Sequence, residues 1–458
     1  MKYKIRNIHF IGIGGVGMSG IAEVLCNLGY SISGSDATSN ANTERLAKIG
    51  IRVCIGHNKS NVGAADVVVT SSAIKSDNPE LVFAAESGIT IVPRAMMLAE
   101  LMRFKHGIAI AGTHGKTTTT SLCAETMAAC GMDPTFIIGG KLAATASNAK
   151  LGSSEYLVVE ADESDASFLY LNPIIAVVTN IDLDHMDTYD HSEEKLQQTF
   201  VDFLHKLPFY GKAILCYEDP RIRSIIPEVK RPILTYGLSS KCDIYATDIK
   251  SNLGKMEYTL CLGDKKVAIK LNLQGVHNVL NSLAVVAVIL ELGGKIEDIA
   301  QALLTFHGVG RRAEHYQNSK INGQEVILVD DYGHHPTELK ATISGLLDAY
   351  PNNRMVLLFQ PHRYTRTRDL FDDFVSVLSN VDTLILLDVY AAGEAPIPRS
   401  DGRSLAKAIR LRGKNNVIFV GDLEEARSVA KSLVRANDLV VTMGAGSIGK
   451  LPQMLMEE

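Results

Sequence analysis

The stretch that most constrains the fold reads Ala109-Ile-Ala-Gly-Thr-His-Gly-Lys-Thr-Thr-Thr-Thr120. Its first residues complete the apolar run 108–111, which is typical of a buried strand. Two glycines then allow a tight turn, and we expect a helix to begin near Lys116. Backbone N–H groups converge at such a turn, where the helix dipole favours an anion. The stretch therefore predicts a phosphate-binding loop, with the ammonium of Lys116 on the outer phosphates of a nucleotide and the hydroxyl of Thr117 on Mg²⁺.

The match to the usual phosphate-loop motif is incomplete, because Ile110 stands where that motif has its first glycine. An ordinary strand-to-helix turn with an exposed lysine is the alternative. The strand, the Gly-x-x-Gly-Lys-Thr-Thr turn and the following helix together favour nucleotide binding over that alternative.

The composition is that of a soluble globular chain with several domains. Of its 458 residues, 46% are hydrophobic and 21% are charged, so two to four domains are expected. A formal net charge of −5 without a long basic run argues against nucleic acid as a partner. The cysteines never form a Cys-x-x-Cys pair, which favours a reducing cytoplasm over a disulfide framework. The N-terminal region has neither a signal-peptide core nor an apolar span of about 18 residues, so no membrane insertion is expected.

Residues 1–106 open with a second strand, glycine turn and helix. A strand is expected at 8–13 and a helix at 16–28, with Gly12-x-Gly14-Gly15-x-Gly17 between them. The next strand, 30–35, ends at Asp36, whose carboxylate can accept a ribose hydroxyl. This pattern predicts a site for a nucleotide diphosphate, which includes both a nicotinamide dinucleotide and a UDP-sugar. A further strand at 65–70 runs into Ser71 and Ser72, whose hydroxyls suit phosphate or sugar, or simply cap the strand.

Two acidic turns follow buried strands in the middle of the chain. The strand 156–160 runs into Glu160-Ala-Asp-Glu-Ser-Asp165, and the strand 174–179 runs into Asn180-Ile-Asp-Leu-Asp-His-Met-Asp187. Carboxylates gathered at a strand end are costly unless water or a cation solvates them. Because open α/β sheets bind ligands at the carboxyl ends of their strands, we expect these turns to hold divalent metal on nucleotide phosphates. A solvated acidic rim is the alternative, for Glu160 and for His185 alike.

Polar residues on a later helix and linker are further candidates for nucleotide contacts. His277, Asn278 and Asn281 lie in the first turns of a helix that extends to residue 292. Their side chains suit a base or a phosphate, although N-capping explains one of them. Arg311 and Arg312 follow two glycines and suit a phosphate, or are simply surface charges.

Residues 319–458 alternate strands with helices and predict a second open, largely parallel α/β unit. Polar motifs follow three of its strands and predict a site for a small polar substrate, in which arginines can bind a carboxylate bidentately. His334 and His335 are adjacent in sequence, which does not support a shared metal. The expected strands are Glu325–Val329, Met355–Phe359, Thr383–Leu387, Val417–Val420 and Leu439–Met443.

In order along the chain, these motifs resemble those of the Mur ligase family. The resemblance covers essentially the whole chain. It rests on His9 to Gly20, Gly112 to Thr118, Glu160 to Asp165, Asn180 to Asp187, Gly275 to Asn278, Asp330 to Pro336 and Phe359 to Tyr364.

The resemblance implies an α/β protein of three domains. These are a Rossmann-like domain at 1–106 that binds a UDP-sugar, a central P-loop ATPase-like domain at 107–318 with a mostly parallel sheet, and a Rossmann-like domain at 319–458 that brings the amino acid.

The resemblance also implies a reaction in peptidoglycan precursor synthesis. ATP phosphorylates the lactyl carboxylate of UDP-N-acetylmuramate, and the amine of L-alanine attacks the resulting acyl phosphate. ATP and Mg²⁺ are the implied cofactors, with two metal ions and Mn²⁺ as an alternative, and the protein is expected to be a monomer or a homodimer. The alternatives are a recycling ligase that adds a whole tripeptide, a nicotinamide-dependent dehydrogenase and a non-enzymatic nucleotide-binding module.

The family's functional residues carry over onto matching positions of this chain. Lys116, His185 and Arg312 are the catalytic candidates, and Thr117, Glu160 and His185 the metal ligands. The ATP site is expected to comprise Gly112, Thr113, His114, Gly115, Lys116, Thr117, Thr118, Asn278, Asn281, Arg312 and Asp331. The UDP-sugar site is expected to comprise Gly14, Gly15, Val16, Gly17, Asp36, Ser71, Ser72 and His114, and the amino-acid end His334, His362, Arg363 and Arg366.

The chain departs from the family pattern at two places. Several relatives use a carbamylated lysine beside the second metal, but the corresponding stretch here is Thr199-Phe-Val-Asp202, so no modified lysine is expected. The family often has an acid in its last glycine turn, where this chain has Ser447, and we assign that position no role.

Overall fold

The computed structural model describes residues 1, 3–140, 147–252, 254–412 and 416–457. It divides into two compact units. One consists of Met1–Asp248, Tyr258–Leu271 and Val279–His307, and the other of Ile249–Glu257, Asn272–Asn278 and Gly308–Glu458. Three sheets of mostly parallel strands carry the fold, which confirms the predicted α/β class. Among the described residues, no helix combines the length and the apolar character needed to cross a bilayer.

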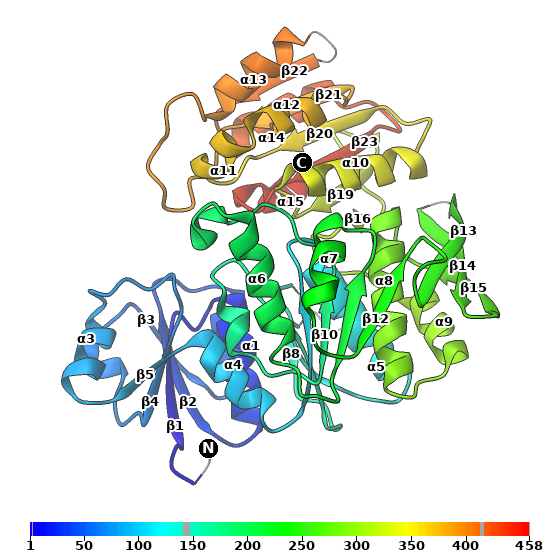
Figure 1. Ribbon diagram of the computed structural model, residues 1–458. Helices are drawn as coiled ribbons and strands as arrows, with labels where there is room; N and C mark the ends of the chain where they lie inside the picture. Colours follow the sequence, from blue (N-terminus) through cyan, green and yellow to red (C-terminus); the bar gives the residue numbers. More distant parts are fainter. Residues whose placement is uncertain (2, 141–146, 253, 413–415, 458) are drawn as a thin grey trace. The chain divides into compact units, whose positions relative to one another are not determined.

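The N-terminal sheet has five parallel strands in the order β3-β2-β1-β4-β5. Helix α3 lies on one side of this sheet and α1 and α4 on the other (Figure 1), so the inner strands β1 and β4 are mostly buried, whereas the edge strands β3 and β5 are partly exposed. The elements are β1 (Asn7–Ile11), α1 (Val16–Asn27), β2 (Ser31–Asp36), α2 (Ala41–Lys48), β3 (Arg52–Ile55), η1 (Lys59–Asn61), β4 (Val67–Thr70), α3 (Pro79–Glu86), β5 (Thr90–Pro93) and α4 (Arg94–Met102).

The central sheet has ten strands in the order β15-β14-β13-β12-β11-β10-β6-β9-β7-β8. Its strands are β6 (His106–Ala111), β7 (Thr135–Ile137), β8 (Ala149–Lys150), β9 (Tyr156–Glu160), β10 (Ile175–Val178), β11 (Lys212–Cys216), β12 (Ile233–Gly237), β13 (Ile244–Asn252), β14 (Lys255–Leu262) and β15 (Lys265–Leu271). Its helices are α5 (Lys116–Ala129), η2 (Ser167–Tyr170), η3 (Met186–Tyr189), α6 (Glu193–Leu204), α7 (Pro220–Ile225), η4 (Ile226–Glu228), α8 (Val276–Glu291) and α9 (Ile296–Thr305).

The C-terminal sheet has the order β16-β19-β23-β20-β21-β22, in which β16 pairs antiparallel with β19 and the remaining neighbours pair parallel. Its strands are β16 (Glu314–Tyr316), β19 (Ile327–Asp331), β20 (Met355–Phe359), β21 (Thr383–Leu387), β22 (Asn416–Val420) and β23 (Leu439–Met443), and a separate hairpin pairs β17 (Lys320–Ile321) with β18 (Gln324–Glu325). The helices are α10 (Pro336–Ala349), α11 (Tyr364–Asp369), α12 (Phe371–Leu378), α13 (Gly402–Leu411), α14 (Leu423–Leu433), η5 (Ser447–Lys450) and α15 (Leu451–Met456).

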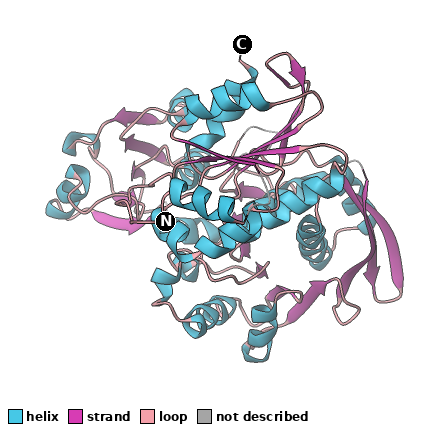
Figure 2. Cartoon of the chain, turned by 90° about the horizontal axis from the view of Figure 1, so that it is seen from above, coloured by secondary structure: helices cyan, strands magenta, loops and turns pink. Residues whose placement is uncertain are grey.

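Alternation along the strands explains why helices cover both faces of the C-terminal sheet. On β20, Leu357 packs with α10, α12 and α13, whereas Val356 and Leu358 pack with α14 and α15. Successive side chains of a strand point to opposite faces, so a continuously apolar strand needs a helical layer on each side. Figure 2 shows these strands in magenta with cyan helices packed along them.

Two strand boundaries differ from those expected from the sequence. The first strand ends at Ile11 rather than at residue 13, because Gly12 adopts φ +79° and turns the chain. The expected strand Glu325–Val329 is wrong by two residues, since β19 extends through Asp330 and Asp331. An aspartate is tolerated inside this buried strand because Arg311 lies 2.8 Å from Asp330, which also accepts a hydrogen bond of 2.6 Å from Thr442.

Candidate active site

The phosphate-loop stretch and both acidic turns follow neighbouring strands. Strand β6 lies between β9 and β10, and all three run parallel. The loops after them, residues 112–115, 161–165 and 179–187, therefore emerge at one edge of the central sheet. The order of strands reverses at β6, and crevices at such positions are where open α/β sheets bind ligands.

The loop between β6 and α5 needs both of its glycines. Gly112 has φ +127° and Gly115 has φ +82°, which are left-handed conformations that side chains rarely adopt. A Cβ on Gly112 would also lie 2.2 Å from the hydroxyl of Thr179. Asn180 holds the loop from outside, accepting a hydrogen bond of 2.8 Å from the N–H of His114 and donating one of 2.9 Å to its carbonyl. The loop is thus preorganised by the strand beside it.

Lys116 is held by the loop itself and by an acidic partner. Its Nζ donates to the carbonyls of Gly112 and Thr113 at 2.6 and 3.0 Å, and lies 2.8 Å from a carboxylate oxygen of Glu163. Burial lowers the pKa of Lys116, but the carboxylates around it outweigh burial and raise it, so the ammonium stays charged. Burial raises the pKa of Glu163 to about 7 against the opposing effect of Lys116. Glu163 belongs to a predicted acidic turn, but its pairing with Lys116 was not predicted.

The three predicted metal ligands lie on the three segments around this loop. Thr117 is in the first turn of α5, and Glu160 ends β9, where its carboxylate accepts a hydrogen bond of 2.8 Å from the N–H of Gly139. His185 has φ +55°, an uncommon conformation for a residue with a side chain. Hydroxyl and carboxylate oxygens fit Mg²⁺, whereas an imidazole nitrogen fits a softer divalent ion better. The donor set therefore fits a divalent cation, and the ligand roles remain predictions.

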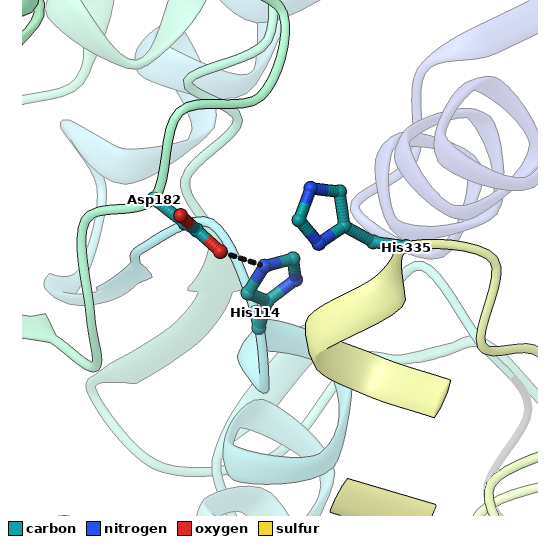
Figure 3. A group of neighbouring side chains, drawn as sticks. All are labelled: His114, Asp182 and His335. Carbon is teal, nitrogen blue, oxygen red and sulfur yellow. Dashed lines mark hydrogen bonds and ion pairs between the residues drawn. The ribbon is translucent and has the colours of Figure 1, made fainter. Parts of the chain in front are cut away.

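His114 is oriented by a chain of charged groups within the same unit. Its Nε2 lies 3.1 Å from a carboxylate oxygen of Asp182 (Figure 3). Arg221 approaches the other oxygen of Asp182 at 3.8 Å and pairs with Glu193 at 2.8 Å. The imidazole of His114 is thereby fixed beside the phosphate loop, where it was predicted to meet both ATP and the muramoyl group.

Two asparagines at the start of α8 were predicted to contact adenine. Asn281 lies against the phosphate loop, since a Cβ on Gly115 would be 2.9 Å from its Oδ1. Asn278, one turn earlier, donates a hydrogen bond of 2.8 Å to the carbonyl of Gln274. The position of Asn281 is consistent with a nucleotide contact, and neither role is tested.

The N-terminal glycine turn lines a cleft of about 360 Å³. Of the residues predicted to bind the UDP-sugar, Gly15, Val16, Gly17, Asp36 and Ser71 line this cleft. Gly14 instead faces α2, because a Cβ on it would lie 2.6 Å from the side chain of Asn40. Asp36 accepts a hydrogen bond of 2.9 Å from the N–H of Gly14 and so stabilises the turn. Ser72 remains a prediction.

His57 and Arg94 also line the cleft, and neither was predicted. A buried carboxylate, Glu80, lies close to His57 and is linked to it through Ser35. Glu80 lies 3.1 Å from His9 and accepts a hydrogen bond of 2.6 Å from Ser35, whose hydroxyl is 3.0 Å from Nδ1 of His57. Burial raises the pKa of Glu80, but hydrogen bonds from His9, Ser35 and its other partners outweigh burial and hold it at about 2.

In the C-terminal unit, the structure brings most of the predicted amino-acid site together. The ring centroids of His334 and His362 are 5.7 Å apart, and Nη1 of Arg366 lies 3.4 Å from the carbonyl of His362. Tyr390, which was not assigned to the site, stacks on His362 with ring centroids 5.4 Å apart. Burial lowers the pKa of His334 to about 4, so this imidazole is neutral near pH 7. Arg363 is exposed and has φ +71°.

The two linker arginines have different surroundings. Arg311 pairs with Asp330 and donates a hydrogen bond of 2.6 Å to the carbonyl of Gly444, so it has a structural role. Asp331 accepts hydrogen bonds of 2.8 and 2.7 Å from the N–H groups of Ala313 and Gly333. Burial raises the pKa of Asp331 to about 6, against the opposing charge of Arg312. Their predicted nucleotide contacts are untested. Ser447, to which we assigned no role, donates a hydrogen bond of 3.2 Å to Gln360.

Comparison with protein families identifies the class of protein. Residues 7–106 match the catalytic domain of the Mur ligase family, residues 110–289 match the Mur ligase middle domain, and residues 311–446 match the glutamate ligase domain of Mur ligases. The chain therefore belongs to the Mur ligase family, and its three-domain α/β fold is confirmed. The domain boundaries predicted after residues 106 and 318 remain predictions.

Individual relatives narrow the class further. The chain is 56% identical to UDP-N-acetylmuramate–L-alanine ligase of Neisseria meningitidis serogroup A, over 100% of this chain and 99% of the relative. It is 56% identical to the enzyme of the same name from Chromobacterium violaceum, over 99% and 98%. The solved structure of UDP-N-acetylmuramate–alanine ligase from Thermotoga maritima superposes with a TM-score of 0.84 and 27% identity, covering 98% of each chain. A murein peptide ligase from Psychrobacter arcticus shares the fold, with a TM-score of 0.73 at 22% identity and 99% coverage of each chain.

Proposed function

We propose that this protein is an ATP-dependent ligase that joins L-alanine to the lactyl carboxylate of UDP-N-acetylmuramate in peptidoglycan precursor synthesis. The observation that carries this function is the full-length 56% identity to enzymes named for that reaction. The phosphate loop with acidic turns on both sides fits the same chemistry, because phosphoryl transfer requires mainly positioning and neutralisation of charge.

The reaction has two steps, a phosphoryl transfer followed by an acyl transfer. A lactyl carboxylate oxygen attacks the γ-phosphorus of ATP, the bond to the bridging oxygen breaks, and ADP leaves. The amine of L-alanine then attacks the carbonyl carbon of the acyl phosphate, phosphate leaves with the electron pair of the C–O bond, and the nitrogen loses a proton to form the amide.

The residues of the central sheet edge have defined roles in this proposal. Lys116 exchanges Glu163 for the β- and γ-phosphates, and the N–H groups of residues 112–117 surround the phosphate chain. Thr117 and Glu160 hold Mg²⁺, and His185 holds a second metal ion. A bound divalent ion supplies neutralisation of the charge on the transferring phosphoryl group. His114, held by Asp182, orients the lactyl carboxylate.

The remaining predicted contacts complete the proposal. Asn278, Asn281, Arg312 and Asp331 contact the nucleotide, and His334, His362, Arg363 and Arg366 bind the amino acid, where an arginine pairs with the carboxylate of alanine. UDP-N-acetylmuramate and L-alanine are the small-molecule partners. We propose that the reaction takes place in the cytoplasm, and that the protein works as a monomer or homodimer.

An assay of ADP release tests the function against its rivals. UDP-N-acetylmuramate with L-alanine should release ADP in a Mg²⁺-dependent reaction, and a whole tripeptide in place of L-alanine should be a much poorer substrate. A preference for the tripeptide would mean that the chain is a recycling ligase. NADH binding without ATP turnover would support a dehydrogenase, and nucleotide binding without turnover a signalling module. With ¹⁸O in the lactyl carboxylate, one label should appear in the released phosphate if an acyl phosphate forms.

A further inference from the structure

Arg94 links the cleft beside the N-terminal glycine turn to the acidic turn beside the phosphate loop. It is the first residue of α4, and its side chain is 26% exposed. On one side, its Nη1 lies 3.0 Å from the position that a Cβ on Gly17 would occupy, in the lining of the cleft. On the other side, its Nη2 lies 3.3 Å from a carboxylate oxygen of Asp162.

The cleft needs a cation if it holds a diphosphate, and Arg94 is the one lysine or arginine among the described residues that line it. Asp36 adds a negative charge and engages the N–H of Gly14. The glycine turn therefore offers less attraction to an anion than the phosphate loop, which contains Lys116. The guanidinium of Arg94, which lies against Gly17, compensates for this weaker attraction of the N-terminal turn for an anion. Arginine binds phosphate oxygens through two parallel N–H groups.

Asp162 connects this guanidinium to the ATP site. Its other carboxylate oxygen accepts hydrogen bonds of 3.1 and 2.7 Å from the N–H and hydroxyl of Ser164, which fix the acidic turn. The next residue, Glu163, is the partner of Lys116. A continuous series of contacts thus runs from the cleft through Arg94, Asp162 and Glu163 to the phosphate loop.

We propose that Arg94 bridges the two substrates' sites, binding the diphosphate of the UDP-sugar through one edge of its guanidinium while the other edge keeps Asp162. This inference rests on the proposed function. Its consequence is that Arg94 both binds the UDP-sugar and fixes the distance between the sugar-borne carboxylate and the ATP site. A lysine at this position keeps the charge, but a single ammonium cannot make both sets of contacts.

Four variants of the full-length enzyme test the bridge, each measured for UDP-N-acetylmuramate affinity by calorimetry without ATP and for kcat. Arg94→Ala should weaken UDP-sugar binding roughly 10- to 100-fold, the range for loss of hydrogen bonds to a charged group. Arg94→Lys should recover much of the affinity but keep a low kcat. Asp162→Asn should bind the UDP-sugar almost as tightly as the wild type and have a low kcat. Arg103→Ala, at the C-cap of the same helix and 70% exposed, is the matched control and should change neither value.

Three results would overturn the proposal. Unchanged UDP-sugar affinity in a folded Arg94→Ala enzyme would place the arginine outside the site. Full recovery of both affinity and kcat in Arg94→Lys would show that charge alone matters. A loss of affinity in Asp162→Asn equal to that in Arg94→Ala would mean that Asp162 only holds the arginine in place. If the wild type itself fails to bind UDP-N-acetylmuramate, the proposed function fails and the inference fails with it, whereas the three results above leave the function intact.

Discussion

Two glycine turns of this chain share one local design and differ in where their charge comes from. Each follows a parallel strand and opens a helix with a glycine as N-cap, Gly15 for α1 and Gly115 for α5. The turn at 112–115 is followed directly by its own cation, Lys116, and its backbone is left-handed at two positions. In the turn at 12–17, the N–H of Gly14 donates to Asp36, and the nearby cation, Arg94, belongs to another helix, α4.

This difference indicates different ligands. A turn with its own lysine can close around the end of a phosphate chain, where the reacting phosphoryl group lies. When the cation lies on a separate element, the ligand can extend past the turn in both directions. A diphosphate in the middle of a longer molecule requires such an arrangement. Strand–glycine–helix geometry thus specifies an anion site, and the charged side chains around it select the anion.

The largest expected effect comes from removing Lys116, the cation that follows the turn at 112–115. Lys116→Ala should lower the rate of ADP formation by about 1,000-fold or more, because the transferring phosphoryl group loses a preorganised charge. UDP-sugar binding should survive, since the lysine does not line that cleft. Calorimetry and a coupled ADP assay measure the two properties. Lys265→Ala, 56% exposed, is the control. Loss of both properties in Lys116→Ala would contradict the division between the turns.

The next effect concerns the metal, which we assign to residues around the phosphate loop and not to the turn at 12–17. Glu160→Gln should raise the Mg²⁺ concentration for half-maximal activity by about tenfold or more, the scale seen when support of a metal site is lost. Glu155→Gln, just before the same strand and 67% exposed, should leave the requirement unchanged. Titration of activity with Mg²⁺ measures both. An unaltered requirement in Glu160→Gln would remove that residue from the metal site.

A smaller effect is expected when each of the two N-cap glycines is replaced by alanine, because their backbone conformations differ. Gly115 has φ +82°, so Gly115→Ala should destabilise α5 by about 1–2 kcal/mol, the cost of a left-handed alanine. Gly15 has φ −60° and its nearest neighbour would be 3.4 Å from a new Cβ, so Gly15→Ala should change α1 by less than about 1 kcal/mol. Amide hydrogen exchange measures the free energy of opening of each helix separately. This is needed because the domains of the chain need not unfold together. Equal costs would show that the turns are conformationally equivalent.

The effect furthest from the reaction concerns the support of the N-terminal cleft and depends on pH. The pKa of Glu80 is held at about 2, below its usual value of 4.5. Its ionised form therefore stabilises the folded domain above pH 4.5, and this stabilisation is lost as the pH falls toward 2. Glu80→Gln should cost about 2 kcal/mol at pH 7. The difference from the wild type should shrink as the pH falls through that window. Glu86→Gln, exposed on the same helix, is the control in urea unfolding across pH. A difference independent of pH would contradict a charged Glu80.

Much of the fold could be predicted because its signals are local. Apolar runs such as 108–111 and 355–359 match β6 and β20 closely, and glycines mark the turns that follow strands. The acidic turns were expected to share a sheet edge with the phosphate loop, since carboxyl ends of neighbouring parallel strands lie together. The strand end at Asp330 and Asp331 was misplaced because Arg311 and Thr442 bind Asp330, and backbone N–H groups bind Asp331, in contacts that no local pattern reveals.

The parts of the site that escaped prediction depend on contacts between distant segments. Arg94 meets Asp162 across 68 residues, and Glu163 meets Lys116 across 47. His57 reaches the cleft because Glu80 and Ser35 hold it there. An arginine at the start of a helix or a histidine in a loop has no periodicity that marks its partner. Tertiary structure is needed to pair such charges.

A crystal structure with a non-hydrolysable ATP analogue, Mg²⁺ and UDP-N-acetylmuramate tests the central claim most directly. We expect the triphosphate on residues 112–117, with Lys116 transferred from Glu163 to the phosphates, and the UDP diphosphate beside residues 12–17. A triphosphate bound at the N-terminal turn, or a Lys116 still paired with Glu163 in the occupied site, would contradict it.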